Sequence, residues 1–196
     1  MMKQKWKPGN MIYPLPAVMV SCGNHEHANI ITIAWTGTIC TNPPMTYVSI
    51  RPSRYSYELI KETGCFVINL TTRRLTKATD YCGVKSGKDR DKFKDMRLTP
   101  SYENETHCPM IDESPVNIEC KVKEIHELGS HHMFIADILN VYVDPHYIDE
   151  KGKFHLNKTD LIAYSHGAYL TLGKEIGTFG YSIKSKKKVK NTNKMK

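Results

Sequence analysis

The sequence lacks long hydrophobic runs. None of its apolar stretches approaches the ~18–20 uninterrupted residues that a membrane-spanning helix requires. The apolar residues after Lys7 are interrupted by Pro8, Pro14 and Pro16, so the first 20 residues do not have the apolar core of a signal peptide. We therefore expect neither a membrane partner nor secretion, and we interpret the three N-x-Thr sequons as chance matches.

Several motifs of catalysis and nucleotide binding are also absent. No G-x-G-x-x-G follows a strand-like run, so there is no sequence signature of a Rossmann dinucleotide site. The segment from Gly83 to Asp89 is not a P-loop, because its glycine spacing is one residue short and an aspartate replaces Ser or Thr. Ser165 lacks the flanking glycine of a nucleophile elbow, and no carboxylate pair stands at a useful spacing. These motifs therefore do not identify the catalytic residues, which the sequence leaves unknown.

The cysteines and histidines show no metal-binding pattern. No two of the six cysteines are closer than twelve residues, so zinc-ribbon and ferredoxin spacings are excluded. Cys22, Cys40 and Cys65 lie within apolar runs, where a free thiol behaves as a small hydrophobic side chain. We expect a reduced, cytoplasmic chain. The motifs His25-x-His27 and His131-His132 have no thiol or carboxylate at ligand spacing, so we expect no metal.

Positive charge is concentrated at the end of the sequence. The chain has 28 Lys and Arg against 20 Asp and Glu, a formal net charge of +8. Residues 184–196 contain seven lysines and no acidic residue, whereas residues 1–183 contain 21 basic and 20 acidic residues. We predict one domain over residues 1–183 and a solvated, flexible tail over 184–196. Lysines without interleaved aromatic residues give no specific nucleic-acid recognition.

The first third of the sequence alternates strand-like runs with turns. Runs rich in β-branched and apolar residues occupy residues 17–22, 29–35, 37–41 and 45–50, and they are separated by Gly-Asn and Asn-Pro-Pro turns. Further on, residues 116–124 and 132–143 predict a pair of strands joined near Gly129. Short strands joined by tight turns are typical of a β-barrel or a β-sandwich.

A few helices interrupt this pattern. Ser53 is a good N-cap for a helix over residues 54–62, which Gly64 would end, and residues 65–70 read as a buried strand. A second helix is predicted over residues 75–82, ending at Gly83, followed by a basic loop or irregular helix over 86–97. The predicted fold class is mainly β with a few helices.

The most informative stretch runs from Asn29 to Ser56. Trp35 precedes a small, hydroxyl-rich turn, and residues 51–56 place two arginines and two serines at a helix start. Free N–H groups at a helix start and bidentate guanidinium donors together form a good phosphate site. Each feature alone also has an ordinary explanation: a capped helix start, or a tryptophan in the core.

Taken together, these segments resemble the flavin reductase-like family, and within it the flavoredoxin branch. The resemblance rests on residues 29–38, Thr41-Asn-Pro-Pro44, residues 48–60 and Asp91-Lys-Phe93, and it covers residues 10–175. It implies a split β-barrel of the FMN-binding type, a homodimer, bound or exchangeable FMN, and oxidoreductase chemistry. NAD(P)H is a candidate electron donor, and a redox protein or a small molecule is the expected electron partner.

The resemblance also implies the residues around FMN. Arg51, Ser53, Arg54 and Ser56 would face the phosphate, and Trp35 to Thr38 and Thr41 would line the isoalloxazine ring. The complete implied set is Asn29, Thr32, Trp35, Thr36, Gly37, Thr38, Thr41, Arg51, Ser53, Arg54, Ser56, Lys92, His131 and Tyr164. Lys92 or a protonated His131 would favour the negatively charged reduced flavin, although Lys92 can equally serve the phosphate.

The sequence is compatible with three hypotheses about function. The first is an FMN oxidoreductase, in which flavin is either a bound electron carrier or a product reduced by NAD(P)H and released. The second is a non-enzymatic module that stores or senses flavin. The third is attraction of nucleic acid or an anionic surface to the lysine-rich tail, which would depend on salt and not on sequence.

Overall fold

The structure is a computed structural model that describes residues 1–183, and the predicted tail over 184–196 lies outside the described residues. The strands and helices, in chain order, are β1 (Leu15–Pro16), β2 (Val18–Cys22), β3 (Asn29–Ile33), β4 (Thr36–Thr41), β5 (Pro44–Ile50), α1 (Tyr55–Thr63), β6 (Cys65–Asn69), α2 (Thr76–Val84), α3 (Lys92–Met96), β7 (Pro100–Ser101), β8 (Met110–Ile111), β9 (Val116–Leu128), β10 (His131–Val143), β11 (Ile162–Ser165) and β12 (Ala168–Thr171). Short 3₁₀ turns connect some of them.

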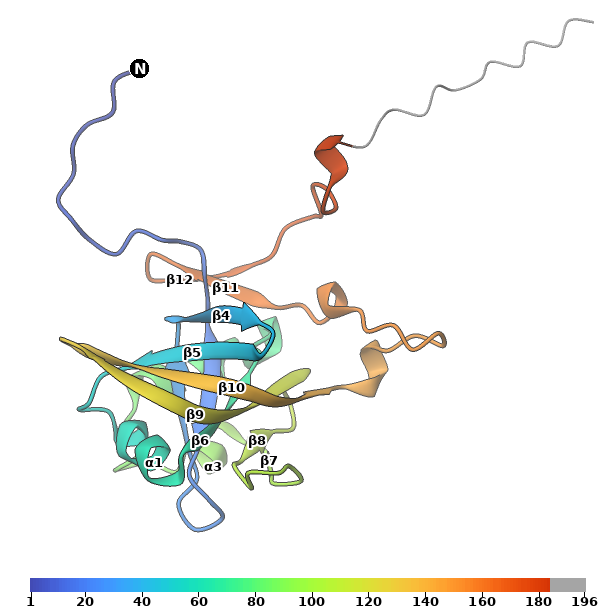
Figure 1. Cartoon of the computed structure of the whole chain (residues 1–196). Helices are drawn as coiled ribbons and strands as arrows, with labels where there is room; N and C mark the ends of the chain where they lie inside the picture. Colours follow the sequence, from blue (N-terminus) through green and yellow to red (C-terminus); the bar gives the residue numbers. More distant parts are fainter. Residues whose placement is uncertain (184–196) are drawn as a thin grey trace, which may run out of the picture.

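Seven of the strands form one antiparallel sheet in the order β3-β2-β6-β9-β10-β5-β4 (Figure 1). The strands at its two ends, β3 and β4, are consecutive in the chain and are joined by Ala34 and Trp35. The amide of Ser49 in β5 donates a hydrogen bond to the carbonyl oxygen of Trp35 at 2.9 Å, which draws this corner onto the sheet. The sheet therefore curls into a barrel, and the predicted mainly-β split barrel is confirmed.

The barrel is filled by apolar side chains that alternate along the strands. Val18, Val20 and Cys22 of β2 point inward with Phe66 and Phe134, all buried. Helix α1 closes one end of the barrel by inserting Tyr57 and Ile60 into the same cluster. This alternation is what a strand with one face toward a core requires.

The outer face of β2 and β3 is also covered. Met19 and Ile30 point away from the barrel interior and pack against Ala78 of α2 and Phe93 of α3. Every residue of β2 is therefore buried. Helices α2 and α3 lie against β2 and β3. Asn29 is the first residue of β3 and Lys92 the first of α3, so this packing brings the two residues close together.

The β9–β10 hairpin is longer than the sequence predicted. Each strand has thirteen residues, and the pair turns at Gly129, whose φ of 64° is left-handed. The predicted turn is confirmed. Glycine suits this position because it adopts a left-handed conformation without a steric penalty. Figure 1 shows the tip of the hairpin extending beyond the barrel.

Two helix boundaries differ from prediction. Helix α1 begins at Tyr55 with Arg54 as N-cap and has no side-chain cap, so Ser53 does not cap it, whereas Gly64 ends it in a left-handed conformation as predicted. Helix α2 continues through Gly83 to Val84, so Gly83 does not end it. Gly83 instead packs against Thr32 of β3: an added Cβ would lie 3.2 Å from the Thr32 side chain, so the close contact between helix and strand favours glycine.

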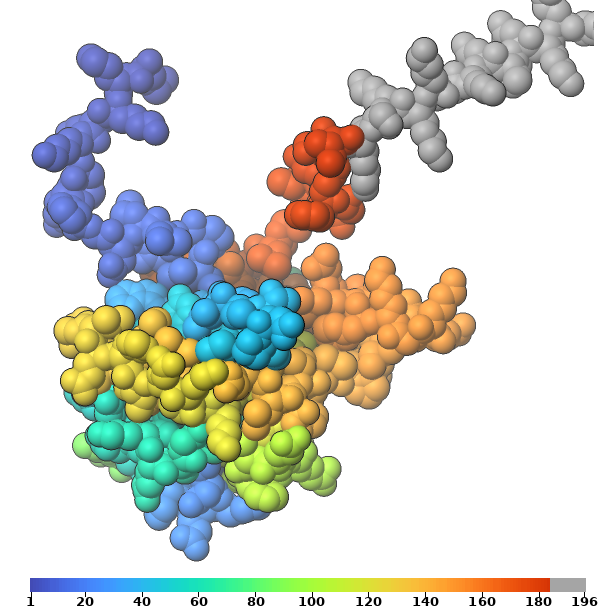
Figure 2. Space-filling view, viewed as in Figure 1, coloured from blue at the N-terminus to red at the C-terminus, as the bar shows by residue number. Residues whose placement is uncertain are grey.

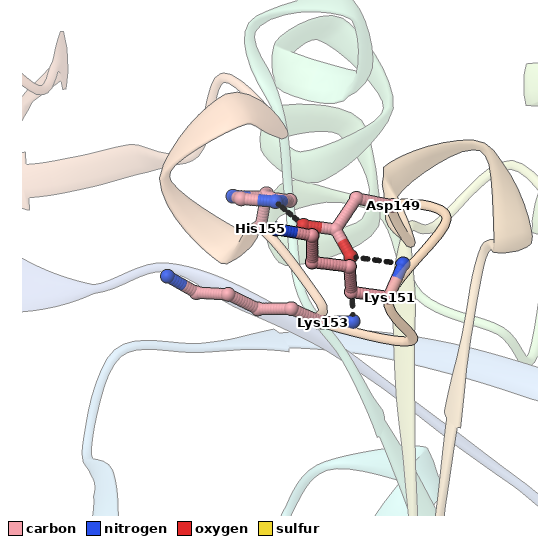
Figure 3. A network of polar contacts seen from close by, with 4 residues as sticks. All are labelled: Asp149, Lys151, Lys153 and His155. Atoms are coloured by element: carbon pink, nitrogen blue, oxygen red, sulfur yellow. Dashed lines mark hydrogen bonds and ion pairs between the residues drawn. The ribbon is translucent and has the colours of Figure 1, made fainter.

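The segment between β10 and β11 is held by a polar network. Asp149 accepts hydrogen bonds from the amides of Lys151 and Lys153 at 3.0 and 2.9 Å and pairs with Nε2 of His155 at 2.8 Å (Figure 3). The hydrogen bond with His155, followed by those from the amides, lowers the pKa of Asp149. These contacts close the loop on itself without a hydrophobic core.

The expectation that every cysteine is reduced is wrong for one pair. Cys65, at the start of β6, and Cys108, in the loop before β8, form a disulfide across 43 residues of sequence. Both pack with Val67 and Met110 in a small apolar cluster, a proximity that the spacing of cysteines along the chain does not reveal. The other four cysteines are free thiols.

Both arms of the chain that flank the barrel are exposed. Residues before β1 and residues 172–183 extend away from the body of the molecule (Figure 2). Trp6, Ile176 and Phe179 in these arms are at least 71 % exposed. Within residues 1–183, no helix combines the length and apolar character needed to cross a membrane.

Candidate functional site

A pocket at the start of α1 collects five of the predicted site residues. Its volume is about 200 Å³, and its walls come from β3, the start of α1, the end of α2 with the following loop, and α3. The five residues are Asn29, Ser53, Arg54, Ser56 and Lys92. Segments that are far apart in the sequence thus meet at one helix start.

Asn29 and Ser56 connect β3 to α1 inside this pocket. The side-chain amide of Asn29 donates to Oγ of Ser56 at 2.8 Å, and both residues are buried. On its other side Asn29 touches Gly87, where an added Cβ would lie 2.2 Å from Oδ1 of Asn29. Only glycine therefore allows the loop after α2 to approach this closely.

The start of α1 presents unused donors. No hydrogen bond among residues 1–183 uses the amide N–H of Tyr55 or Ser56, and the N-cap has no side-chain acceptor. The first amides of a helix carry a partial positive charge and attract anions. Arg54 lies at this position without an ion pair among the described residues. The arrangement is a cradle for a phosphate or another small anion.

Lys92 is buried and held in place by backbone carbonyls. Its ammonium group donates to the carbonyl oxygens of Ile30 and Cys82 at 2.6 and 2.9 Å. Burial lowers the pKa of Lys92, and Arg54 lowers it further, whereas the thiols of Cys82 and Cys22 oppose this shift. An ammonium group has three N–H donors, so one is left for the pocket. Lys92 thus lies on the same side as the α1 cradle.

A second group of predicted residues lies around Trp35. The rings of Trp35 and His131 are 4.4 Å apart between centroids, at an angle of 48°. Burial, followed by the charges of Arg51 and Arg54, lowers the pKa of His131. This shift favours the neutral imidazole, and the positive charge near His131 comes from the two arginines. Arg54 also lines the pocket, so it connects the Trp35 group to the pocket, whereas Arg51 does not line it.

The residues of β4 have structural partners. Thr36 donates from Oγ1 to the carbonyl oxygen of Tyr47 at 2.5 Å, and Gly37 accepts from Oγ1 of Thr46 at 2.9 Å. Thr38 and Thr41 are exposed on the same strand. These residues do not line the pocket; they form the barrel edge that continues from Trp35.

Two further predicted residues lie elsewhere. Thr32 donates a hydrogen bond to the carbonyl oxygen of Thr79 and so faces α2 instead of the pocket. Tyr164 belongs to the small β1-β11-β12 sheet, where its ring lies 5.5 Å from that of Tyr169. The hydroxyl of Tyr169 contacts Asp80 of α2 at 3.3 Å. The single chain therefore does not bring Thr32 or Tyr164 into the pocket.

Sequence reasoning missed part of the pocket wall. Lys85, Ser86 and Gly87 line the pocket from the loop after α2, together with Tyr55 and Cys82. The glycine-bounded segment 83–87 matches no P-loop, and its sequence predicts no other binding role. The signal that it carried was the glycine itself, which permits the close approach to Asn29.

A larger concavity of about 750 Å³ lies by the start of α2 and contains none of the predicted residues. Its walls carry charges of both signs, among them Arg74, Lys77 and Arg97 facing Asp112 and Asp160. This mixture does not favour an anion, whereas the smaller pocket combines three cations (Arg54, Lys85 and Lys92) with unused amides and hydroxyls. The chemistry therefore favours the smaller pocket as the candidate site.

The comparisons with known proteins agree with this architecture. Residues 10–173 match the family model described as flavin reductase like domain. An uncharacterized protein of Archaeoglobus fulgidus is 32 % identical over 160 residues, which cover 82 % of this chain and 89 % of that protein.

Solved structures give the same result. The flavoredoxin of Desulfovibrio vulgaris (Miyazaki F) is 31 % identical with a TM-score of 0.85, over 93 % of this chain and 100 % of that chain. The flavoredoxin of Methanosarcina acetivorans is also 31 % identical, with a TM-score of 0.83, over 91 % and 95 % of the two chains. The protein described here belongs to the flavin reductase-like family.

Proposed function

We propose that this protein is an FMN-binding oxidoreductase of the flavoredoxin type. The observation that carries the proposal is the pocket at the start of α1, where Ser53, Arg54, Ser56 and Lys92 surround unused helix amides beside the Trp35–His131 pair. A phosphate ester attached to a planar ring requires this combination of donors and an aromatic neighbour. The solved relatives with about one third identity are flavoredoxins, which supports the same assignment.

The residues divide the work of holding FMN. Arg54, the hydroxyl of Ser56 and the amides at the start of α1 would bind the phosphate, and Lys92 would add the third donor of its ammonium group. Trp35 and the adjoining backbone of β4 would lie against the isoalloxazine ring. When bound, FMN supplies reversible electron transfer. The protein's part is to fix the flavin's position and limit its contact with water.

A homodimer forms part of this proposal. Exposed apolar side chains in both arms, among them Trp6, Ile176 and Phe179, are more than a single chain can cover. A second copy that covers these arms would also bring further residues to the edge of the site. Sedimentation velocity on the full chain gives twice the 22.4 kDa chain mass if this is correct, and a monomer at micromolar concentration would contradict it.

The first test is the visible absorption spectrum of the purified protein before and after addition of FMN. We expect a flavin spectrum and saturable binding, and a protein that remains colourless and binds no added FMN would contradict the proposal. Arg54→Ala should weaken FMN binding by ~1.5–3 kcal/mol, the cost of a hydrogen bond to a charged group. Arg73→Ala is the control, since Arg73 is exposed and lies outside the pocket.

Anaerobic mixing with NADH or NADPH distinguishes the two mechanisms. A bound electron carrier bleaches slowly or not at all with either nicotinamide, whereas an NAD(P)H-dependent flavin reductase bleaches rapidly and releases reduced FMN. A module that only stores or senses flavin would bind FMN and show negligible turnover with every donor and acceptor.

A further inference from the structure

Two adjacent histidines of β10 serve different faces of the barrel. Successive side chains of a strand point to opposite faces. The ring of His131 accordingly meets Trp35, 4.4 Å away, whereas His132 reaches Tyr57 of α1. One dipeptide therefore touches both the aromatic side of the candidate site and the helix that carries its anion cradle.

Tyr57 and His132 are in direct contact, and Nδ1 of His132 also lies 3.9 Å from Oε1 of the exposed Glu127. The Tyr57 hydroxyl lies 2.8 Å from Nδ1 of His132, and the two rings meet edge to face at 5.4 Å. Tyr57 is 4 % exposed and also packs edge to face on Phe134 at 5.2 Å. In a neutral histidine with its proton on Nε2, Nδ1 accepts the hydrogen bond from the hydroxyl.

This pair is unusual for its place in the fold. Tyr57 belongs to an apolar cluster with Val48, Ile50, Ile60 and Phe134, so its hydroxyl is a polar group at the side of that cluster. Apolar contacts are not directional, so they do not by themselves fix the angle at which α1 docks on the barrel. A hydrogen bond requires both a particular distance and a particular angle, so it can fix the angle at which α1 docks.

We propose that Tyr57 and His132 form a clamp that positions the start of α1 for flavin binding; the inference rests on the proposed FMN site. Neither residue lines the pocket, so both act as positioning residues. Ser56, next to Tyr57, is tied to β3 by Asn29 at 2.8 Å. The helix start is thus tied to β3 through Ser56 and to β10 through Tyr57, and the clamp sets the spacing between Arg54 and the Trp35–His131 pair.

The test compares Tyr57→Phe with Tyr142→Phe. Both substitutions remove one tyrosine hydroxyl from a hydrogen bond, but Tyr142 bonds to Glu119 at 3.1 Å, outside the pocket. We expect Tyr57→Phe to raise the Kd for FMN about fivefold, the factor that corresponds to one neutral hydrogen bond. It should also change the visible circular dichroism of the bound flavin, whereas Tyr142→Phe should change neither.

Substitutions of His132 complete the design. His132→Phe removes the acceptor and should weaken FMN binding as Tyr57→Phe does, whereas His132→Asn places an amide oxygen near the position of Nδ1 and should restore affinity. Equal Kd values for Tyr57→Phe, Tyr142→Phe and the wild type would overturn the clamp. A wild-type protein that binds no FMN would instead overturn the proposed function, so the two failures are distinguishable.

Discussion

Gly87 provides the sharpest test of the pocket. Its backbone φ is not left-handed, so alanine can adopt the same conformation, and the effect of Gly87→Ala comes from crowding alone. The added Cβ would lie 2.2 Å from Oδ1 of Asn29 and 2.8 Å from Cδ1 of Tyr55. Ordinary contacts require roughly 3.5 Å, so the Asn29 side chain or the loop after α2 must move by about 1 Å or more.

This movement weakens contacts that hold the anion cradle in place. Overpacking a tight site costs ~1–3 kcal/mol. If Asn29 rotates away, its hydrogen bond to Ser56, which is 2.8 Å long, is lost at about 1 kcal/mol. If the loop retreats instead, the wall that carries Lys85 and Ser86 moves outward. Either response disturbs the place where the phosphate is proposed to bind.

We therefore expect Gly87→Ala to raise the Kd for FMN about tenfold, which corresponds to ~1.4 kcal/mol. Fluorescence titration of FMN measures this, with thermal unfolding recorded in parallel. Gly173→Ala is the matched control, because nothing lies within 4 Å of its added Cβ and its φ is not left-handed. A Gly87→Ala variant that binds FMN within about twofold of wild type would refute the reasoning.

The remaining predictions concern charge and stability. Burial alone would raise the pKa of Glu119, but hydrogen bonds from Asn140, Thr106 and Tyr142 outweigh it and lower this pKa. Glu119→Gln should lower the free energy of unfolding by about 2–3 kcal/mol at neutral pH. Because the pKa of Glu119 is depressed in the folded protein, this contribution to stability is lost as the pH falls through that pKa. Urea unfolding at several pH values checks the trend. Because the pKa of Lys92 is lowered, its ammonium group loses its proton at a lower pH than an ordinary lysine does as the pH is raised. FMN binding to the wild type should thus weaken as the pH rises into the alkaline range, whereas binding to Lys92→Met should be weak and without this step. For the disulfide, thiol titration of the denatured, unreduced protein should detect four thiols. Cys65→Ser should lower the unfolding free energy by about 4 kcal/mol, the chain-entropy value for a link across 43 residues, and this difference should vanish in reductant.

Sequence patterns predicted the barrel well where the signal is local. Runs of apolar and β-branched residues mark strands over residues 17–22 and 45–50, and these became β2, which is buried on both faces, and β5. Gly129 and Gly64 marked a hairpin turn and a helix end, because both positions have a left-handed backbone. Such signals depend on residues within a few positions of one another, so they can be read directly.

Helix boundaries were less predictable, and tertiary contacts explain why. Ser53 is a good cap by residue type, yet the helix begins two residues later and leaves its first amides free beside the pocket. If the Ser53 side chain had capped the helix, it would have accepted a hydrogen bond from one of these amides. That amide is instead available to the candidate site. Gly83 is a typical helix end, but Thr32 of β3 lies against it and the helix continues to Val84.

The candidate site was predicted only in part. Asn29, Ser56 and Lys92 meet in the pocket as the family resemblance implied, whereas Thr32 faces α2. Gly87 was missed, because its requirement is a close approach to a side chain 58 positions earlier in the chain. No pattern within a single segment encodes such a contact.

By itself, the sequence determined the β-rich fold class, the helix start at residues 53–56 and the local arginines, since these follow from propensities and charges of neighbouring residues. Only the tertiary structure decided which distant groups meet. The Asn29–Ser56 bond spans 27 positions, the Lys92–Ile30 bond 62 and the Tyr57–His132 contact 75. The antiparallel register of the barrel and the packing of α1, α2 and α3 against it fix these meetings, because a one-residue slip would turn each strand's side chains to the opposite face.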